Sequence, residues 1–209
     1  MKTITVDNQK ITPSKILCIG RNYAEHIAEL GNEIPDDMVV FNKPNSAIST
    51  ELCSYHQEPL HYEGELCFVV THGQFSAVGF GLDLTKRTLQ SKLKAKGLPW
   101  ERAKAFNGSA VFSDFVTVDE DVSQLTMELS INGEVKQASG CSYMIYKPEI
   151  LLSEISSFMT LQDNDIVMTG TPSGVGKIQH GDEFNCKLFN GDDLLVERFW
   201  QVKHYNNDE

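Results

Sequence analysis

Two glutamates stand two positions apart within residues 61–70, HYEGELCFVV, at the start of a β-rich run. Because alternate residues of a strand point to the same face, Glu63 and Glu65 are expected to project together. Cys67 and Val69 continue that face into apolar surroundings, which draws the carboxylates towards the interior. Like charges repel there and burial is costly, so a bound cation would make the pair favourable. The alternative is a solvated strand end with both acids in water.

A third carboxylate, Asp83, stands between a predicted glycine-rich turn at residues 79–81 and the start of a predicted helix. Capping the N-terminus of that helix is the ordinary role of an aspartate in this position. Beside Glu63 and Glu65, however, Asp83 would complete an all-oxygen set of ligands suited to Mg²⁺, Mn²⁺ or Ca²⁺.

A histidine and a glutamate are spaced for contact within residues 20–30, GRNYAEHIAEL. If this segment is helical, His26 and Glu29 are i, i+3 neighbours and their side chains can meet. A carboxylate bonded to an imidazole fixes its tautomer and raises its basicity, as a general base requires. The alternative is a surface pair on an amphipathic helix.

A fourth segment, residues 165–176, predicts a strand that runs into the loop TGTPSGVG. Hydroxyls and backbone N–H groups in such a tight loop can cradle a carboxylate or an enolate oxygen. The loop lacks the G-K-[ST] ending of a phosphate-binding P-loop, so the sequence argues against nucleotide binding.

The elements that must position these residues are mostly strands. Short β-rich runs recur at residues 15–20, 38–42, 63–70, 127–131, 165–169, 183–188 and 194–202. Asn132-Gly133 predicts a two-residue hairpin, and Asn190-Gly191 marks a second reversal of the chain.

Three helices are predicted, at residues 22–30, 85–96 and 148–158. Gly31 and Gly97 are placed as C-terminal caps of the first two, and Pro148 suits the first position of the third. Many strands, few helices and no steady β-α alternation favour an α+β domain built on curved, mostly antiparallel sheets.

Composition narrows the class of protein further. With 29 acidic and 18 basic side chains among 209 residues, the net charge is -11, which disfavours nucleic acid and anionic membranes as partners. We expect one domain over residues 1–209, and the cytoplasm as its compartment, since no signal peptide or membrane span is evident. The five scattered cysteines suggest neither a disulfide framework nor a thiolate metal site.

Three matches together identify a family. They are Gly20-Arg21-Asn22-Tyr23 followed by His26, Glu63-x-Glu65 with Asp83, and Thr169-Gly170-Thr171-Pro172-x-Gly174-Val175-Gly176. In this order, spread over residues from about 15 to 190, they resemble the fumarylacetoacetate hydrolase family. The resemblance is closest to its short members of the acylpyruvase and oxaloacetate decarboxylase type.

The resemblance implies a role for each matched residue. Glu63, Glu65 and Asp83 correspond to ligands of Mg²⁺ or Mn²⁺, and His26 and Glu29 to a catalytic pair on a lid helix. Lys104 corresponds to the active-site lysine. Positions near the substrate correspond to Arg21, Arg87, Gln90 and Thr171. The implied fold is a mixed β-sandwich roll with a few short helices, assembled as a homodimer.

The implied chemistry acts on small 2-oxo acids. We expect hydrolysis of the C–C bond of acylpyruvates to pyruvate and a carboxylic acid, with oxaloacetate decarboxylation or enol–keto tautomerisation as the enzymatic alternative. A catalytically inactive protein that binds small acids is the third possibility. Where many members have aspartate and proline, this chain has Asn107 and Val111, which puts the shape of the substrate pocket in question.

Overall fold

The computed structural model describes residues 1–29, 31, 35–118 and 121–203. Its larger sheet is formed by β3 (Lys15–Gly20), β4 (Val39–Pro44), β5 (Ile48–Ser49), β9 (Gly64–Thr71), β10 (Gln74–Asp83), β11 (Ala110–Phe112), β12 (Val116–Thr117) and β15 (Ile166–Met168). The strand order is β4-β3-β15-β9-β10-β11-β5, with β12 paired to β10. The β3–β15 and β5–β11 pairs are parallel and the others antiparallel, so the sheet is mixed.

A second, antiparallel sheet has the order β14-β13-β17-β18. Its strands are β13 (Leu125–Ile131), β14 (Glu134–Gly140), β17 (Glu183–Asn190) and β18 (Asp193–Gln201). At the predicted hairpin, φ is 52° at Asn132 and 80° at Gly133, as a two-residue turn of this kind requires. The predicted reversal at Gly191 is also present, with φ 57°.

The remaining strands form three small pairs. These are β1 (Ile4–Val6) with β2 (Gln9–Ile11), β6 (Tyr55–His56) with β7 (Glu58–Pro59), and β8 (His61–Tyr62) with β16 (Gly176–Lys177). All seven predicted strand segments overlap a strand of the two large sheets, with ends that differ by at most two residues.

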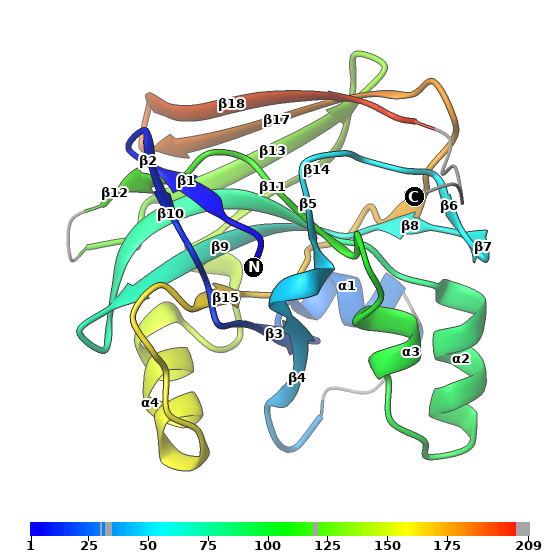
Figure 1. The fold of residues 1–209 in the computed structure, drawn as a ribbon, viewed down its shortest axis with the longest axis horizontal. Helices are drawn as coiled ribbons and strands as arrows, with labels where there is room; N and C mark the ends of the chain where they lie inside the picture. Colours follow the sequence, from blue (N-terminus) through cyan, green and yellow to red (C-terminus); the bar gives the residue numbers. More distant parts are fainter. Residues whose placement is uncertain (30, 32–34, 119–120, 204–209) are drawn as a thin grey trace.

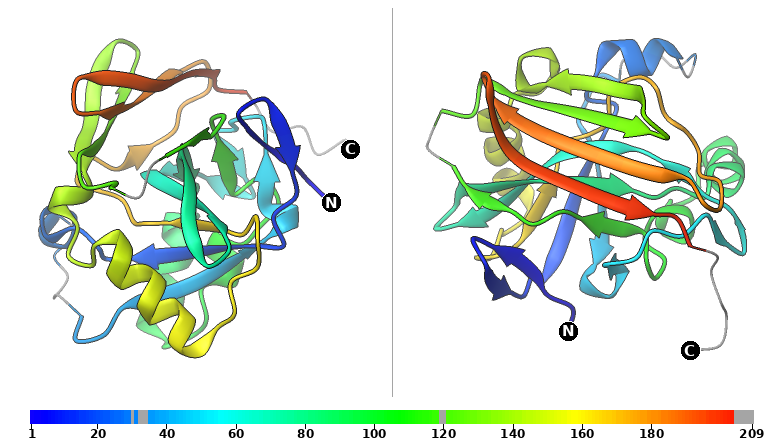
Figure 2. Two further views of the ribbon diagram at one scale, coloured as in Figure 1. Left: turned by 90° about the vertical axis from the view of Figure 1, so that its left-hand side faces the viewer. Right: turned by 90° about the horizontal axis from the view of Figure 1, so that it is seen from above.

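The two sheets pack face to face, with the four-stranded sheet lying across the larger one (Figures 1 and 2). The core between them joins Leu66, Phe68 and Phe80 of the larger sheet to Leu129 and Phe184 of the smaller. The opposite side of the larger sheet is also covered, so that residues 64–70 of β9 are all buried. The expected α+β roll of mixed strands is confirmed, and it places the β9 side chains in the interior on both faces.

The helices are α1 (Ala24–Glu29), α2 (Arg87–Ala95), α3 (Glu101–Lys104) and α4 (Pro148–Phe158), with single 3₁₀ turns at η1 (Asn45–Ala47) and η2 (Cys141–Tyr143). Helices α2, α3 and α4 lie on the side of the larger sheet away from the four-stranded one (Figure 1). None of the helices in the described residues is long and apolar enough to cross a membrane.

The three predicted helices are present, and α3 is an addition that the sequence did not predict. Gly31 and Gly97 end the first two helices with φ of 60° and 61°, as expected of C-terminal caps. The first helix begins at Ala24, two residues later than predicted, and Leu30 lies outside the described residues.

The prediction of a glycine-rich turn before Asp83 is wrong. Residues 79–83 belong to β10, Asp83 is its last residue, and α2 begins only at Arg87. The glycines serve close packing instead, because a Cβ on Gly79 would lie 2.7 Å from the Phe115 ring. A Cβ on Gly81 would lie 2.4 Å from the sulfur of Cys67. Asp83 is therefore a strand residue and not the cap of a helix.

We expect Gly81→Ala to destabilise the protein by about 1–3 kcal/mol, the usual cost of overpacking a core. The added methyl would meet the Cys67 sulfur and, at 3.0 Å, the Phe112 ring. Chemical denaturation followed by fluorescence measures the free energy of unfolding. Glu134→Ala, at an exposed position of β14, is the control. Equal stability of Gly81→Ala and the wild type would contradict the packing argument.

Candidate active site

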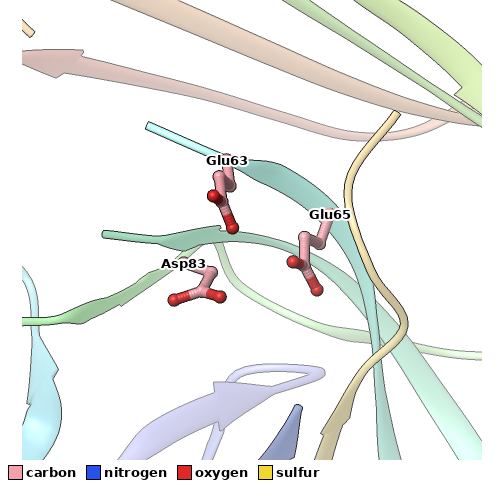
Figure 3. A group of neighbouring side chains, drawn as sticks. All are labelled: Glu63, Glu65 and Asp83. Atoms are coloured by element: carbon pink, nitrogen blue, oxygen red, sulfur yellow. The ribbon is translucent and has the colours of Figure 1, made fainter. Parts of the chain in front are cut away.

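Three buried carboxylates converge where β9 begins and β10 ends (Figure 3). Glu63 immediately precedes β9, Glu65 is its second residue, and Asp83 closes β10. The ladder sets them side by side, because the N–H of Asp83 donates to the carbonyl of Glu63 at 2.8 Å and Gly81 lies opposite Glu65. One ligand oxygen from each side chain lies within 4.8 Å of the others. The solvated strand end is therefore wrong, and the predicted ligand set is brought together.

Glu65 carries the charge that the protein compensates least. Its Oε2 accepts a hydrogen bond from the N–H of Gly170 at 2.8 Å, but within the described part of the chain it forms no ion pair. Burial, and then the charges of Asp83 and Glu63, raise the pKa of Glu65 well above its usual value. A divalent cation would relieve this cost, and carboxylate oxygens are the ligands that Mg²⁺ and Mn²⁺ prefer. The donor set fits such an ion.

Two buried lysines supply positive charge to the cluster. Lys104, the last residue of α3, donates from Nζ to Glu63 Oε2 at 2.7 Å and to Asp83 Oδ2 at 2.6 Å. Burial disfavours its charge, but Asp83 and Glu63 outweigh this effect and raise the pKa of Lys104. The Nζ of Lys43 lies 2.8 Å from Asp83 Oδ1 and also donates to the carbonyl of Lys104. Lys104 thus lies at the predicted site as a charged group.

The first turn of α2 delivers Arg87 and Gln90 to the same place. The guanidinium of Arg87 is bonded to Glu63 Oε1 and donates to Gln90 Oε1 at 2.9 Å. Burial alone would raise the pKa of Glu63. The charges of Lys104 and then Arg87 lower it by more than burial raises it, so the pKa lies well below its usual value. Glu63 is therefore a stably ionised ligand candidate.

The predicted pair on α1 is formed. His26 Nδ1 lies 3.0 Å from Glu29 Oε2, and the imidazole is buried while Glu29 is partly exposed. The other oxygen of Glu29 accepts a hydrogen bond from the N–H of Gly174 at 3.1 Å. This second bond fastens α1 to the TGTPSGVG loop, so the orientation of His26 depends on that loop.

The TGTPSGVG loop is fixed by the protein itself. The hydroxyl of Thr171 donates to the carbonyl of Gly64 at 2.9 Å and accepts from Gln137 Nε2 at 2.8 Å. Gln137 also accepts from the N–H of Gly64 at 2.9 Å and donates to the carbonyl of Pro172 at 2.9 Å. Because a hydroxyl has one proton, the expected donation from Thr171 to a substrate oxygen would require breaking its bond to Gly64.

Nine of the ten predicted site residues line one cavity of about 40 Å³, and the tenth, Glu29, contacts it through His26. The nine are Arg21, His26, Glu63, Glu65, Asp83, Arg87, Gln90, Lys104 and Thr171. Asn107 and Val111 do not line this cavity, and Val111 is buried in β11. The departure from the family pattern at these two positions therefore lies outside the cavity wall.

Three further residues belong to the site although the sequence analysis did not select them: Lys43, Lys94 and Gln137. Lys43 stands two positions after Phe41 and therefore shares a strand face with an apolar residue. This was a usable signal that Lys43 is buried beside a charged partner, since charged side chains are rarely buried without one. Lys94 and Gln137 have no such signal, because lysine on a helix and glutamine on a strand are ordinary surface residues.

This chain is similar to several known proteins over most of its length. Oxaloacetate tautomerase YcgM of Escherichia coli (strain K12) is 39% identical over 205 residues, which cover 88% of this chain and 91% of that protein. The mitochondrial oxaloacetate decarboxylase of Dictyostelium discoideum is 36% identical over 195 residues, 85% of this chain and 89% of that protein.

The crystal structure of fumarylpyruvate hydrolase from Pseudomonas aeruginosa, in complex with Mn²⁺ and pyruvate, superimposes with a TM-score of 0.86 at 28% identity. The match covers 98% of this chain and 96% of that one. The sequence profile of the fumarylacetoacetate (FAA) hydrolase C-terminal family matches residues 15–197. Since that profile spans most of the sequence, the chain belongs to the fumarylacetoacetate hydrolase C-terminal family.

Proposed function

We propose that this protein is a divalent-metal-dependent enzyme that interconverts the enol and keto forms of oxaloacetate. One observation carries the proposal: a single small cavity joins the carboxylate cluster to Lys104 and His26. A cation site, a fixed positive charge and a candidate base therefore face the same small volume. The relatives named oxaloacetate tautomerase and oxaloacetate decarboxylase, at 39% and 36% identity, support this substrate over an acylpyruvate.

The protein side chains divide the work of tautomerisation. When bound, Mg²⁺ or Mn²⁺ supplies Lewis-acid polarisation of the 2-keto oxygen. Lys104 adds positive charge near the oxygen on which negative charge develops. With its Nδ1–H donated to the Glu29 carboxylate, His26 can accept the C3 proton of the keto form at Nε2, and the enolate oxygen takes a proton from water to give the enol. The enol-to-keto direction reverses both transfers. Arg21, Arg87 and Gln90 orient the substrate.

Hydrolysis of the C–C bond of acylpyruvates is the second candidate. It is favoured by the same His26–Glu29 pair, which could activate water, and by the likeness to fumarylpyruvate hydrolase. The relatives with higher identity support it less than they support oxaloacetate chemistry. A protein that only binds small acids is the third candidate, and it would bind oxalate without turnover.

The assembly is part of the same proposal. We expect residues 1–209 to act as one catalytic unit on a small-molecule 2-oxo acid, without nucleic acid or membrane as a partner. A homodimer, which the resemblance to the family implies, belongs to this proposal as well.

The metal assignment predicts that a chelator abolishes activity and that Mg²⁺ or Mn²⁺ restores it, with Zn²⁺ a poor substitute at an all-carboxylate site. Glu65→Gln should abolish Mn²⁺ binding in calorimetry. Because glutamine keeps the size of the side chain and removes a carboxyl group whose ionisation is disfavoured by burial and by Asp83 and Glu63, the metal-free variant should melt no lower than the wild type. Glu134→Ala, at an exposed position, is the control. Unchanged Mn²⁺ affinity in Glu65→Gln would refute the ligand assignment.

The role of His26 predicts a split between two reactions of the same substrate. His26→Ala should slow tautomerisation by about 10²–10⁴-fold, the usual worth of general acid–base assistance. Decarboxylation of oxaloacetate should fall much less, because loss of CO₂ needs no proton transfer from C3. Enol absorbance follows the first reaction and coupled detection of pyruvate the second, corrected for decarboxylation by free metal. His72→Ala, at an exposed histidine, is the control. An equal fall in both rates would argue against this role.

A further inference from the structure

Lys94 lines the cavity from the far end of α2. Its side chain is partly buried, and its Nζ lies 4.9 Å from the centre of the Trp100 ring, in a cation–π contact. Among the ion pairs formed by the described residues, none includes Lys94. A lysine held at a cavity wall without a carboxylate partner is able to bind an anion.

The spacing along α2 places Lys94 on the helix face that lines the cavity. Arg87, Gln90 and Lys94 stand at i, i+3 and i+7, so they share one face of the helix, and all three line the cavity. Side chains in a helix lean towards its N-terminus, which here is the end where Arg87 contacts Glu63. Lys94 therefore extends back along the row towards the carboxylate cluster.

Positive charge gathers on this side of the cavity. Partial burial, and then the charges of Arg21 and Arg87, lower the pKa of Lys94 to about 8. Glu63 acts in the opposite direction and Lys104 adds a further lowering effect. A bound anion beside Lys94 would be stabilised by the same field that disfavours its ammonium group.

We propose that Lys94 binds the C4 carboxylate of a four-carbon 2-oxo diacid and thereby selects diacids over 2-oxo monoacids. The inference rests on the proposed function, in which the 2-keto end of the substrate lies at the divalent-metal site of Glu63, Glu65 and Asp83. The distal carboxylate of oxaloacetate then needs a cation at the other end of the cavity. Lys94 lines that cavity, where its ammonium group contacts the Trp100 ring and forms no ion pair with a carboxylate of the described residues.

The test compares Lys94→Met, Lys94→Arg and the control Lys92→Met, an exposed lysine of the same helix. In Lys94→Met the KM for enol oxaloacetate should rise about tenfold, the scale of a lost charge-assisted hydrogen bond, with little change in kcat. The inhibition constant of oxalate, which has no distal carboxylate, should stay within about twofold of the wild-type value, a ratio far smaller than one charged contact supplies. Lys94→Arg should restore most of the KM, and Lys92→Met should match the wild type.

Two outcomes would overturn the inference. An unchanged KM in Lys94→Met would mean that the lysine only packs against Trp100. An equal weakening of oxalate and oxaloacetate would mean that it acts on all anions through its general charge. If the wild type does not tautomerise oxaloacetate, the proposed function fails. Calorimetric titration of the Mn²⁺-loaded proteins with freshly dissolved oxaloacetate and with oxalate then still decides whether Lys94 selects the diacid.

Discussion

Three carboxylates whose oxygens lie within 4.8 Å of one another are held in the interior of this protein, and much of the surrounding structure supplies them with compensating charge. Two unit charges 4 Å apart interact by roughly 4 kcal/mol at an effective dielectric constant of 20, so the repulsion cannot be left unopposed. Lys104 and Lys43 meet Asp83, and Lys104 and Arg87 meet Glu63. Glu65, which these cations leave unpaired, is the member that a divalent ion would serve best.

The groups that compensate the carboxylates and the groups that hold the nearby loop come from elements far apart in the sequence. Together they involve both sheets. The larger sheet contributes the carboxylates and Lys43, while α2 and α3 bring Arg87 and Lys104. The smaller sheet contributes Gln137, which binds both Gly64 and the Thr171 loop. The loop can lie this close to β14 only because position 174 is glycine, where φ is 95° and a Cβ would lie 2.0 Å from the carbonyl of Lys136. The packing of the two sheets therefore also sets the position of the loop that holds Glu65.

A site of this kind suits several reactions of 2-oxo acids, because all of them place negative charge on the same oxygen. Under the function proposed here, the carboxylate cluster with its divalent ion and Lys104 would meet that shared requirement. What separates tautomerisation, decarboxylation and C–C hydrolysis is whether a base acts on C3 or on water, and what binds the far end of the substrate. Under the function proposed here, the His26–Glu29 pair would supply the base, and the α2 face that carries Arg87 and Lys94 would bind the far end of the substrate.

Local sequence determined the features that depend on neighbouring residues. The alternation of Glu63 and Glu65 placed both on one face, the i, i+3 spacing of His26 and Glu29 allowed their contact, and Asn132-Gly133 formed the hairpin. The glycines at positions 79 and 81, by contrast, suggested a turn from sequence but proved to be strand residues, because Phe115 and Cys67 occupy the space of a side chain. Only tertiary packing could decide this, since those contacts join residues distant along the chain. The same reason applies to Lys94 and Gln137, whose burial and partners follow from how the helices and sheets meet, while the strand position of Lys43 beside Phe41 gave a signal that the sequence could have used.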